Sequence, residues 1–172
     1  MHVITAKGFT FTESLIVLAL FSVSIVFLPA ITQWQQKQTL LSQRTELRTL
    51  ISTARNDSLQ YNQSITLCSL DTLSRCRSDW SGSIVLFKDY DSNRALTETE
   101  QILQRLEIPP EIQIQWKGTL PKNSIHFAGN GMTSLSNGTL YLCHRKLNFQ
   151  TRIIINKQGR SRTEPISEGC DA

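Results

Sequence analysis

The sequence predicts an α+β protein in which one long N-terminal helix packs on a small antiparallel β-sheet or sandwich domain. An uncharged run extends from Ser14 to Gln36, apolar residues then recur at helical spacing up to residue 60, and short alternating runs follow Tyr61. This change of hydrophobic period marks the change from helix to strands. A length of 172 residues suits a single core with an appendage.

The most apolar segment, Leu15 to Ile31, is long enough to cross a bilayer as a helix. We therefore predict a transmembrane helix over residues 9–36. A cleavable secretory signal is the alternative, because Lys7 precedes the apolar run and Leu28-Pro29-Ala30 is compatible with a small-residue cleavage site. Glu13 argues against that alternative, since a carboxylate at the start of an apolar helix is costly without an interface or a partner.

A heptapeptide directly precedes this run, Lys7-Gly8-Phe9-Thr10-Phe11-Thr12-Glu13. It resembles the leader of type IV pilins and type II secretion pseudopilins. The resemblance implies that a prepilin peptidase cuts between Gly8 and Phe9, removes residues 1–8 and N-methylates Phe9. It also implies that Glu13 pairs with the N-terminal amine of a neighbouring subunit. The protein is then expected in the inner membrane with a periplasmic domain, and afterwards in a pilus or pseudopilus at the cell surface.

Residues 37–60 are expected to continue the helix as an amphipathic segment. Polar and charged residues separate apolar ones in a helical pattern. The apolar positions are Leu40, Leu47, Leu50, Ile51 and Ala54. Pro29 lies earlier in the same helix and is expected to remove one hydrogen bond and to bend or loosen it locally.

Residues 61–172 are expected to form the β domain. Short alternating or apolar runs predict strands at Ser64–Cys68, Ser83–Phe87, Glu111–Trp116, Ser124–Phe127, Thr139–Cys143 and Thr151–Ile155. Turn residues punctuate them at Asp91-Ser92-Asn93, Pro109-Pro110, Gly129-Asn130-Gly131 and Asn137-Gly138. The last pair stands where a tight hairpin turn would join two strands. Residues 97–106 are compatible with a short helix or a polar loop.

The four cysteines are Cys68, Cys76, Cys143 and Cys170. In an oxidising compartment they can form two disulfides in any of three connectivities, while buried thiols or metal ligands are the alternatives. No pair has the C-x-x-C spacing of a zinc site, and the export signal favours disulfides.

The β domain resembles that of GspH/FimT-type minor pilins in the order of several short patches. These are Thr66-Leu67-Cys68, Cys76 with Asp79-Trp80, Ile125-His126-Phe127 with Gly129, Leu140-Tyr141-Leu142-Cys143, and Arg152-Ile153-Ile154-Ile155-Asn156 with Gly159-Arg160-Ser161-Arg162. Together with the leader, the resemblance spans nearly the whole chain. It implies the disulfides Cys68–Cys76 and Cys143–Cys170, and other major and minor pilins as partners.

The sequence contains no recognisable catalytic constellation. Its histidines are His2 in the leader, His126 in an expected strand and His144 beside a cysteine. Nucleophile-elbow and Gly-rich phosphate-loop motifs are absent from it. We therefore expect neither an enzyme nor a cofactor or metal site. The tryptophans are interpreted as membrane-interface or core residues, namely Trp34, Trp80 and Trp116.

The segment from His144 to Arg162 carries several basic residues and no acidic one. Such a run is usually only a solvated face. A phosphate-binding site is the alternative, because Arg160 and Arg162 on an extended backbone project from one face, roughly 6.6 Å apart. Arginine grips phosphate oxygens with two donors at once. Gly159 is expected to allow a turn with positive φ and to let a polymer approach the backbone closely.

The four residues Gly159-Arg160-Ser161-Arg162 also resemble the GRxR motif of FimT-like pilins, which bind DNA and support natural transformation. The resemblance implies that this motif, with Lys157 and Arg152, binds extracellular double-stranded DNA without sequence specificity and promotes its uptake. A structural role is the alternative: a minor pilin or pseudopilin that initiates or caps a type IV pilus or a type II secretion pseudopilus.

Overall fold

The computed structural model describes residues 10–120, 122–133, 135–147 and 149–166, and the side chains of residues 23–29 lie outside that description. One long helix, α1 (Phe11–Tyr61), precedes the strands. The strands are β1 (Ile65–Leu70), β2 (Cys76–Arg77), β3 (Ser83–Lys88), β4 (Ile102–Glu107), β5 (Ile112–Gly118), β6 (Ile125–Phe127), β7 (Gly138–His144), β8 (Gln150–Ile155) and β9 (Ser161–Ile166). The chain separates into two compact units, residues 1–36 and residues 37–172.

Thr10 caps the N-terminus of α1. Its hydroxyl accepts a hydrogen bond from the backbone N–H of Glu13 at 3.3 Å, and its carbonyl accepts one from the N–H of Ser14 at 3.2 Å. Glu13 therefore lies in the first turn, where the positive end of the helix dipole favours a carboxylate. The expected start of the helix, Phe9, lies outside the described residues. The backbone stays helical through position 29.

Among the described residues, no helical stretch has the length and the apolar character that a membrane crossing requires.

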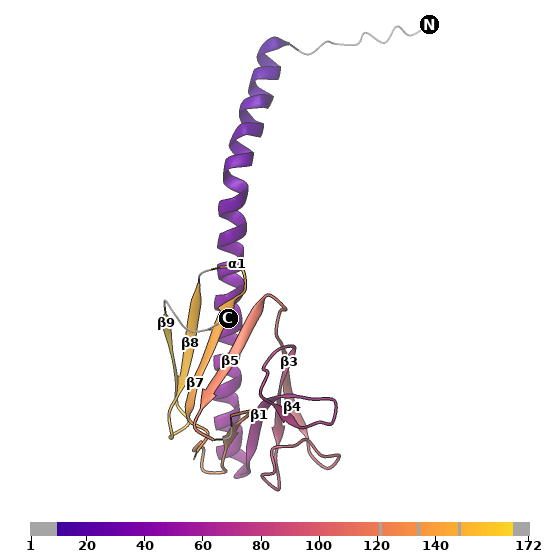
Figure 1. Cartoon of the computed structure of the whole chain (residues 1–172), viewed down its shortest axis with the longest axis vertical. Coiled ribbons are helices and arrows are strands. Elements are labelled where there is room, and N and C mark those ends of the chain that lie inside the picture. The colour runs from indigo at the N-terminus through magenta and orange to yellow at the C-terminus, as the bar shows by residue number, and fades with distance from the viewer. Residues whose placement is uncertain (1–9, 121, 134, 148, 167–172) are drawn as a thin grey trace, which may run out of the picture. The chain divides into compact units, whose positions relative to one another are not determined.

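The predicted amphipathic part of α1 is confirmed. All five apolar residues of its predicted stripe are buried, each at most 1% exposed. They pack in a single apolar cluster with both sheets, to which the first sheet contributes Leu67 and Leu86 and the second contributes Leu140 and Ile153. Figure 1 shows the strands of both sheets arranged around this part of α1. The core of the domain is therefore built around the helix.

The strands form two antiparallel sheets, which confirms the predicted α+β class. The first sheet has the order β2-β1-β3-β4, and β6 also pairs with β1. The second sheet has the order β5-β7-β8-β9. Strand β9 is thus one edge of the second sheet, and its register opposite β8 places Arg162 beside Ile154 and Glu164 beside Arg152.

The six predicted strands are present, and three further strands lacked a sequence signal. Strand β2 has only two residues. In β4 the two partly buried leucines, Leu103 and Leu106, are three residues apart, so that the alternation expected of a strand is missing. Strand β9 contains Pro165 and mostly polar residues, as an edge strand tolerates. Residues 97–106, which the sequence alone makes compatible with a short helix or a polar loop, therefore run into β4.

The predicted hairpin turn at Asn137-Gly138 is wrong. Gly138 begins β7 and pairs with Gly118 of β5 and Ile155 of β8, while the preceding strand in sequence, β6, belongs to the other sheet. A Cβ on Gly138 would lie 2.4 Å from the carbonyl oxygen of Lys117. The glycine is needed because two strands approach closely there, and not because the chain turns.

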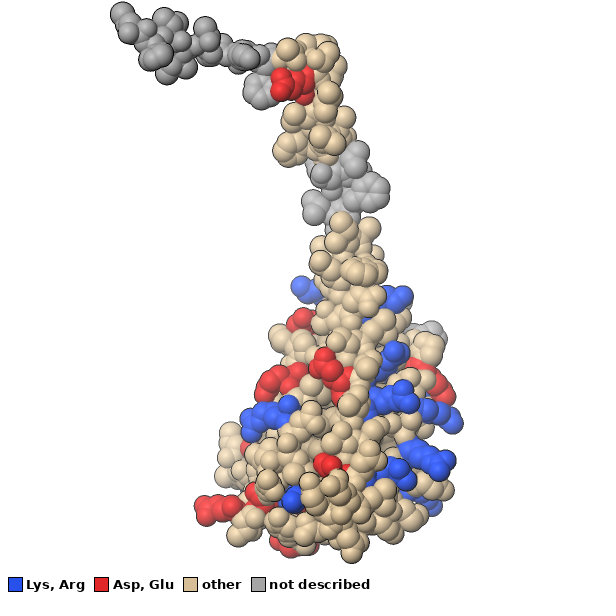
Figure 2. All heavy atoms as spheres, turned by 180° about the vertical axis from the view of Figure 1, so that it is seen from behind, with Lys and Arg blue, Asp and Glu red and all other residues tan. Residues whose placement is uncertain are grey.

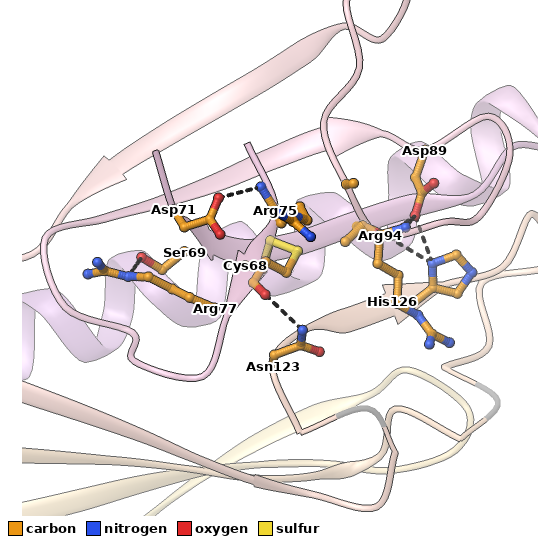
Figure 3. Close-up of a disulfide and its surroundings, with 12 residues drawn as sticks. Cys68, Ser69, Asp71, Arg75, Arg77, Asp89, Arg94, Asn123 and His126 are labelled. Atoms are coloured by element: carbon orange, nitrogen blue, oxygen red, sulfur yellow. Dashed lines mark hydrogen bonds and ion pairs between the residues drawn. A yellow bond between two sulfur atoms is a disulfide. The ribbon is translucent and has the colours of Figure 1, made fainter. Parts of the chain in front are cut away.

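Cys68 of β1 and Cys76 of β2 form a disulfide, with their Cα atoms 5.5 Å apart. Figure 3 shows this bond between the two strands, where Asn123 donates a hydrogen bond to the backbone carbonyl of Cys76 at 2.8 Å. Cys143 is also disulfide-bonded. Its expected partner, Cys170, lies outside the described residues.

Candidate nucleic-acid interface

The basic motif lies at the turn of the β8–β9 hairpin. The N–H of Asn156 donates to the carbonyl of Arg160 at 3.1 Å, and the N–H of Gly159 donates back to the carbonyl of Asn156 at 2.9 Å. Gly159 has a φ of 74°. This geometry is that of a three-residue hairpin loop closed by a glycine in the left-handed region. The positive φ expected of Gly159 is therefore confirmed.

Neighbouring elements hold the backbone of this turn in place. Arg55 of α1 donates from Nε to the carbonyl of Gln158 at 3.0 Å. Thr133 donates its backbone N–H to the carbonyl of Lys157 and its hydroxyl to the carbonyl of Asn156, each at 3.0 Å. The turn is consequently fixed from two sides before any ligand binds.

The second role expected of Gly159, close approach of a polymer to its backbone, is wrong. Gly159 is buried. A Cβ at this position would lie 2.4 Å from the carbonyl oxygen of Gly131 and 3.0 Å from Cδ of Arg55. The glycine therefore makes room for the protein's own backbone and not for a ligand.

Arg160 and Arg162 are both exposed, and Ser161 between them is half-buried. The side chain of Arg162 is 72% exposed. The two arginines thus flank a less exposed residue where the hairpin turn enters the edge strand, as an extended backbone requires. Lys157 is also exposed at the turn.

An acidic residue that follows the basic run changes its electrostatics. Glu164 accepts a hydrogen bond from Nε of Arg152 at 3.0 Å and forms an ion pair with Nε of Arg162 at 3.0 Å. The hydrogen bond from Arg152 holds the pKa of Glu164 below its ordinary value, although desolvation opposes this shift. Arg152 is therefore occupied by an internal partner, and Arg162 shares that partner.

The structure also brings three helix arginines to this edge, which no sequence motif indicates. Arg44, Arg48 and Arg55 lie on one flank of the buried stripe of α1, because their spacing of four and seven residues keeps them on one face. Arg44 donates to the hydroxyl of Thr151 at 3.5 Å, and Arg55 reaches Gln158. Lys and Arg gather along one side of the domain in Figure 2. Helical periodicity alone identifies this flank.

Acidic residues occupy the other flank of the same helix. Glu46 and Asp57 lie there by helical spacing. Asp57 interacts with Lys88 of β3, which partly offsets the rise in the pKa of Asp57 caused by burial. The helix therefore presents positive charge toward the β8–β9 hairpin and negative charge toward the first sheet.

The two histidines that the structure describes are buried. Nδ1 of His126 lies 2.8 Å from the hydroxyl of Thr66, which donates to Asp89 at 2.6 Å. Thr66 is 0% exposed, so that its hydroxyl is not offered to a substrate. His144 accepts a hydrogen bond from the N–H of Lys146. Both described histidines are thus hydrogen-bonded within the fold.

Two of the tryptophans are confirmed as core residues. Trp80 is 0% exposed and Trp116 is 6% exposed, and their ring centroids lie 6.3 Å apart. Trp34, in the first unit, is 61% exposed.

Residues 43–159 match the family described as Type II transport protein GspH. The chain belongs to the GspH family. The match runs from the amphipathic part of α1 to the hairpin turn and ends one residue before Arg160. The family assignment thus covers the fold and the helix arginines, while Arg160 and Arg162 lie beyond it. No curated protein matches this sequence.

Solved minor pilins and pseudopilins have a fold similar to that of this GspH-family chain. The type IV minor pilin FimU of Pseudomonas aeruginosa superposes with a TM-score of 0.59 at 17% identity, over 77% of this chain and 92% of FimU. The minor pseudopilin EpsH of the type 2 secretion system of Vibrio cholerae gives 0.50 at 10% identity, over 73% of this chain and 94% of EpsH. Because these identities are low, the likeness shows the fold of a minor pilin or pseudopilin.

Two glycines with positive φ provide a test of the hairpin's packing. Gly159→Ala is expected to destabilise the protein by about 2 kcal/mol or more, because a left-handed φ costs about 1–2 kcal/mol and the new Cβ also overlaps Gly131. Gly82→Ala is the matched control, since Gly82 has a φ of 80° but open space around its Cβ position. Urea denaturation of the purified full-length chain measures both. Equal losses at the two positions would show that contact with Gly131 is unimportant.

Proposed function

We propose that this GspH-family minor pilin binds extracellular double-stranded DNA without sequence specificity and thereby promotes DNA uptake in natural transformation. The observation that carries the proposal is the pair of exposed arginines, Arg160 and Arg162, on a hairpin whose backbone is already held by α1 and Thr133. A preorganised site loses little conformational entropy on binding. The resemblance of Gly159-Arg160-Ser161-Arg162 to the GRxR motif of FimT-like pilins supports the same function.

The chemistry of the hairpin favours contacts with phosphates over contacts with bases. Backbone positions that alternate along an extended chain are about 6.6 Å apart, so that the guanidinium group carried by each can engage its own phosphate. Trp80 and Trp116 are buried and provide no platform for base stacking. Phosphate contacts carry no sequence information, and the proposed binding is therefore sequence-independent.

The helix arginines extend the proposed interface around the edge of β9. Arg48 is exposed on the flank of α1 from which Arg44 and Arg55 contact the β8–β9 hairpin. Their positive potential attracts a polyanion without direct contact. Arg152 contributes less, because Glu164 neutralises it.

We further propose that the chain reaches this role by the route of type IV pilins. A prepilin peptidase cuts between Gly8 and Phe9, Phe9 is N-methylated, and residues 9–36 anchor the protein in the inner membrane before it joins other pilins in the filament. Glu13 pairs with the N-terminal amine of a neighbouring subunit. The sequence Lys7-Gly8-Phe9 before an apolar run supports this proposal. Gly8, Phe9 and the leader lie outside the described residues.

The processing step has a direct test. Intact mass and N-terminal sequencing of the membrane-extracted protein are expected to show N-methylated Phe9 as the first residue, because the peptidase removes residues 1–8. Gly8→Asp is expected to leave the longer precursor in the membrane. A mature protein that starts at Ile31 would instead indicate cleavage by an ordinary signal peptidase.

The DNA site is tested with a double variant, Arg160→Gln with Arg162→Gln. The purified full-length parent is expected to bind unrelated duplexes with similar, micromolar affinity. Fluorescence anisotropy over a salt series is expected to show that the slope of log K against log salt becomes less negative in the double variant, by about 0.9 for each arginine. The variant is expected to remain folded, since exposed substitutions change stability by about 0.5 kcal/mol or less. Unchanged affinity in a folded variant would reject the site.

Glu164→Gln is the matched variant with the opposite expected effect. It removes the carboxylate that Arg152 and Arg162 share, so that both become available to phosphates and the salt slope becomes steeper. Because Arg152 lowers the pKa of Glu164, this carboxylate stays ionised at mildly acidic pH, and acidification from pH 8 to 5 does not reproduce the effect of the substitution. Weaker DNA binding by this variant would mean that Glu164 organises the site and does not oppose it.

A structural role is the second candidate. The folds of FimU and EpsH, a minor pilin and a minor pseudopilin, favour a subunit that initiates or caps a pilus or pseudopilus. The two candidates differ in what the Arg160→Gln, Arg162→Gln variant does in cells. A DNA receptor keeps its pili and loses DNA uptake, whereas a priming or capping subunit loses pili as well.

A further inference from the structure

The connection between β3 and β4 carries oxygen-bearing side chains at the spacing of a calcium-binding loop. Counted from Asp89, the loop has Asp91 at its third position, Asn93 at its fifth and Glu100 at its twelfth. The twelve-residue loop of EF-hands has Asp at its first position, Asp or Asn at the third and fifth, and a Glu at the twelfth that binds calcium through both oxygens. The sixth position is the one departure, because Arg94 stands where that loop has glycine.

The backbone at this sixth position nevertheless has the conformation that the glycine supplies. Arg94 has a φ of 61°, in the left-handed region that side chains other than glycine rarely adopt. Its N–H donates to Oδ2 of Asp89 at 3.2 Å. In Figure 3 the guanidinium group of Arg94 extends away from the carboxylate of Asp89. The sharp turn of the loop is therefore present, and the charge of Arg94 is directed elsewhere.

The acidic side chains of the loop converge. Asp89, Asp91 and Glu100 each offer a carboxylate oxygen, and these oxygens all lie within 4.8 Å of one another. Asp89 is 0% exposed, and its Oδ1 is buried without a hydrogen-bond partner among the described residues. A buried carboxylate oxygen without a donor is unfavourable, and like charges in close proximity repel each other. A cation bound between the three carboxylates removes the repulsion, and a cation held by Oδ1 of Asp89 also gives that oxygen a partner.

We propose that residues 89–100 bind one calcium ion through Asp89, Asp91, Asn93 and Glu100. A set of oxygen ligands suits Ca²⁺, which accepts six to eight oxygens in variable geometry. Magnesium is expected to bind more weakly, because it requires a stricter octahedron and gives up its water reluctantly. Zinc prefers nitrogen and sulfur ligands, which these four residues do not provide.

Bound calcium would connect the loop to the disulfide-bearing sheet. Asp89 is hydrogen-bonded to Thr66 of β1 through Oδ2 and lies 3.5 Å from Nδ1 of His126 of β6. At the other end of the loop, the N–H of Leu96 donates to the carbonyl of Ser74 at 2.8 Å, and its side chain packs against the cluster that contains Cys68 and Cys76. We therefore expect calcium to raise the thermal stability of the domain.

Isothermal titration of the EDTA-treated full-length chain with CaCl₂ tests the proposal. One saturable site is expected, with a Kd of roughly 10⁻⁵ to 10⁻³ M, the range of weaker sensor sites and extracellular modules. Glu100→Gln is expected to raise the Kd at least about tenfold, because it removes the charge and one of the two oxygens of the bidentate ligand. Glu98→Gln is the matched control. This substitution removes the same negative charge from a position of the loop that is not a proposed ligand.

Two further variants keep the proposal testable if Glu100→Gln does not fold. Asp91→Asn changes an exposed ligand and is also expected to weaken calcium binding. Arg94→Gly removes a positive charge and relieves the strained φ, and it is expected to strengthen calcium binding. Terbium luminescence, sensitised by Tyr90 at the second position of the loop, reports on the same site. Absence of saturable binding up to about 10 mM calcium would overturn the proposal, as would equal effects of Glu98→Gln and Glu100→Gln.

Discussion

The burial of one stripe of α1 between two sheets is the contact on which the rest of this domain depends. Leu47, Ile51 and Ala54 are 0% exposed and belong to the same apolar cluster as the inner residues of both sheets. Full burial of a leucine or isoleucine side chain contributes about 2 kcal/mol, so that the stripe supplies a large part of a small domain's net stability. Without the helix, each sheet would expose the face that now forms the core.

The same helix arranges the charges of the domain. Because the buried stripe fixes the rotation of α1, Arg44 and Arg55 are turned toward the β8–β9 hairpin, and Asp57 is turned toward Lys88 of the first sheet. The hairpin in turn depends on the helix, since Arg55 holds the carbonyl of Gln158. The stability of the core and the proposed DNA interface are thus coupled through the orientation of a single element.

Two loops with left-handed residues carry charged groups of the two proposed binding sites. Gly159 allows the β8–β9 turn to pack on Gly131, which leaves Arg160 and Arg162 at the exposed start of an edge strand. Arg94 adopts a similar φ at the cost of strain, and the acidic residues around it converge. A turn held in an uncommon backbone conformation by the surrounding fold is a frequent feature of ligand sites. The sequence Asp91-Ser92-Asn93 by itself predicts only a turn, because spacing alone does not show whether carboxylates meet.

The sequence by itself determined the long helix, its buried stripe, six of the strands and the family, because hydrophobic periodicity and short motifs are local properties of the chain. The tertiary structure alone decided which residues meet across long separations. It paired Glu164 with Arg152, buried Gly159 against Gly131 and showed Gly138 to be a point of close strand approach instead of a turn. It also identified β9 as a strand, since an edge strand of polar residues acquires its register from β8 and not from its own pattern. These features depend on hydrogen bonds and close contacts between distant segments, which no local pattern encodes.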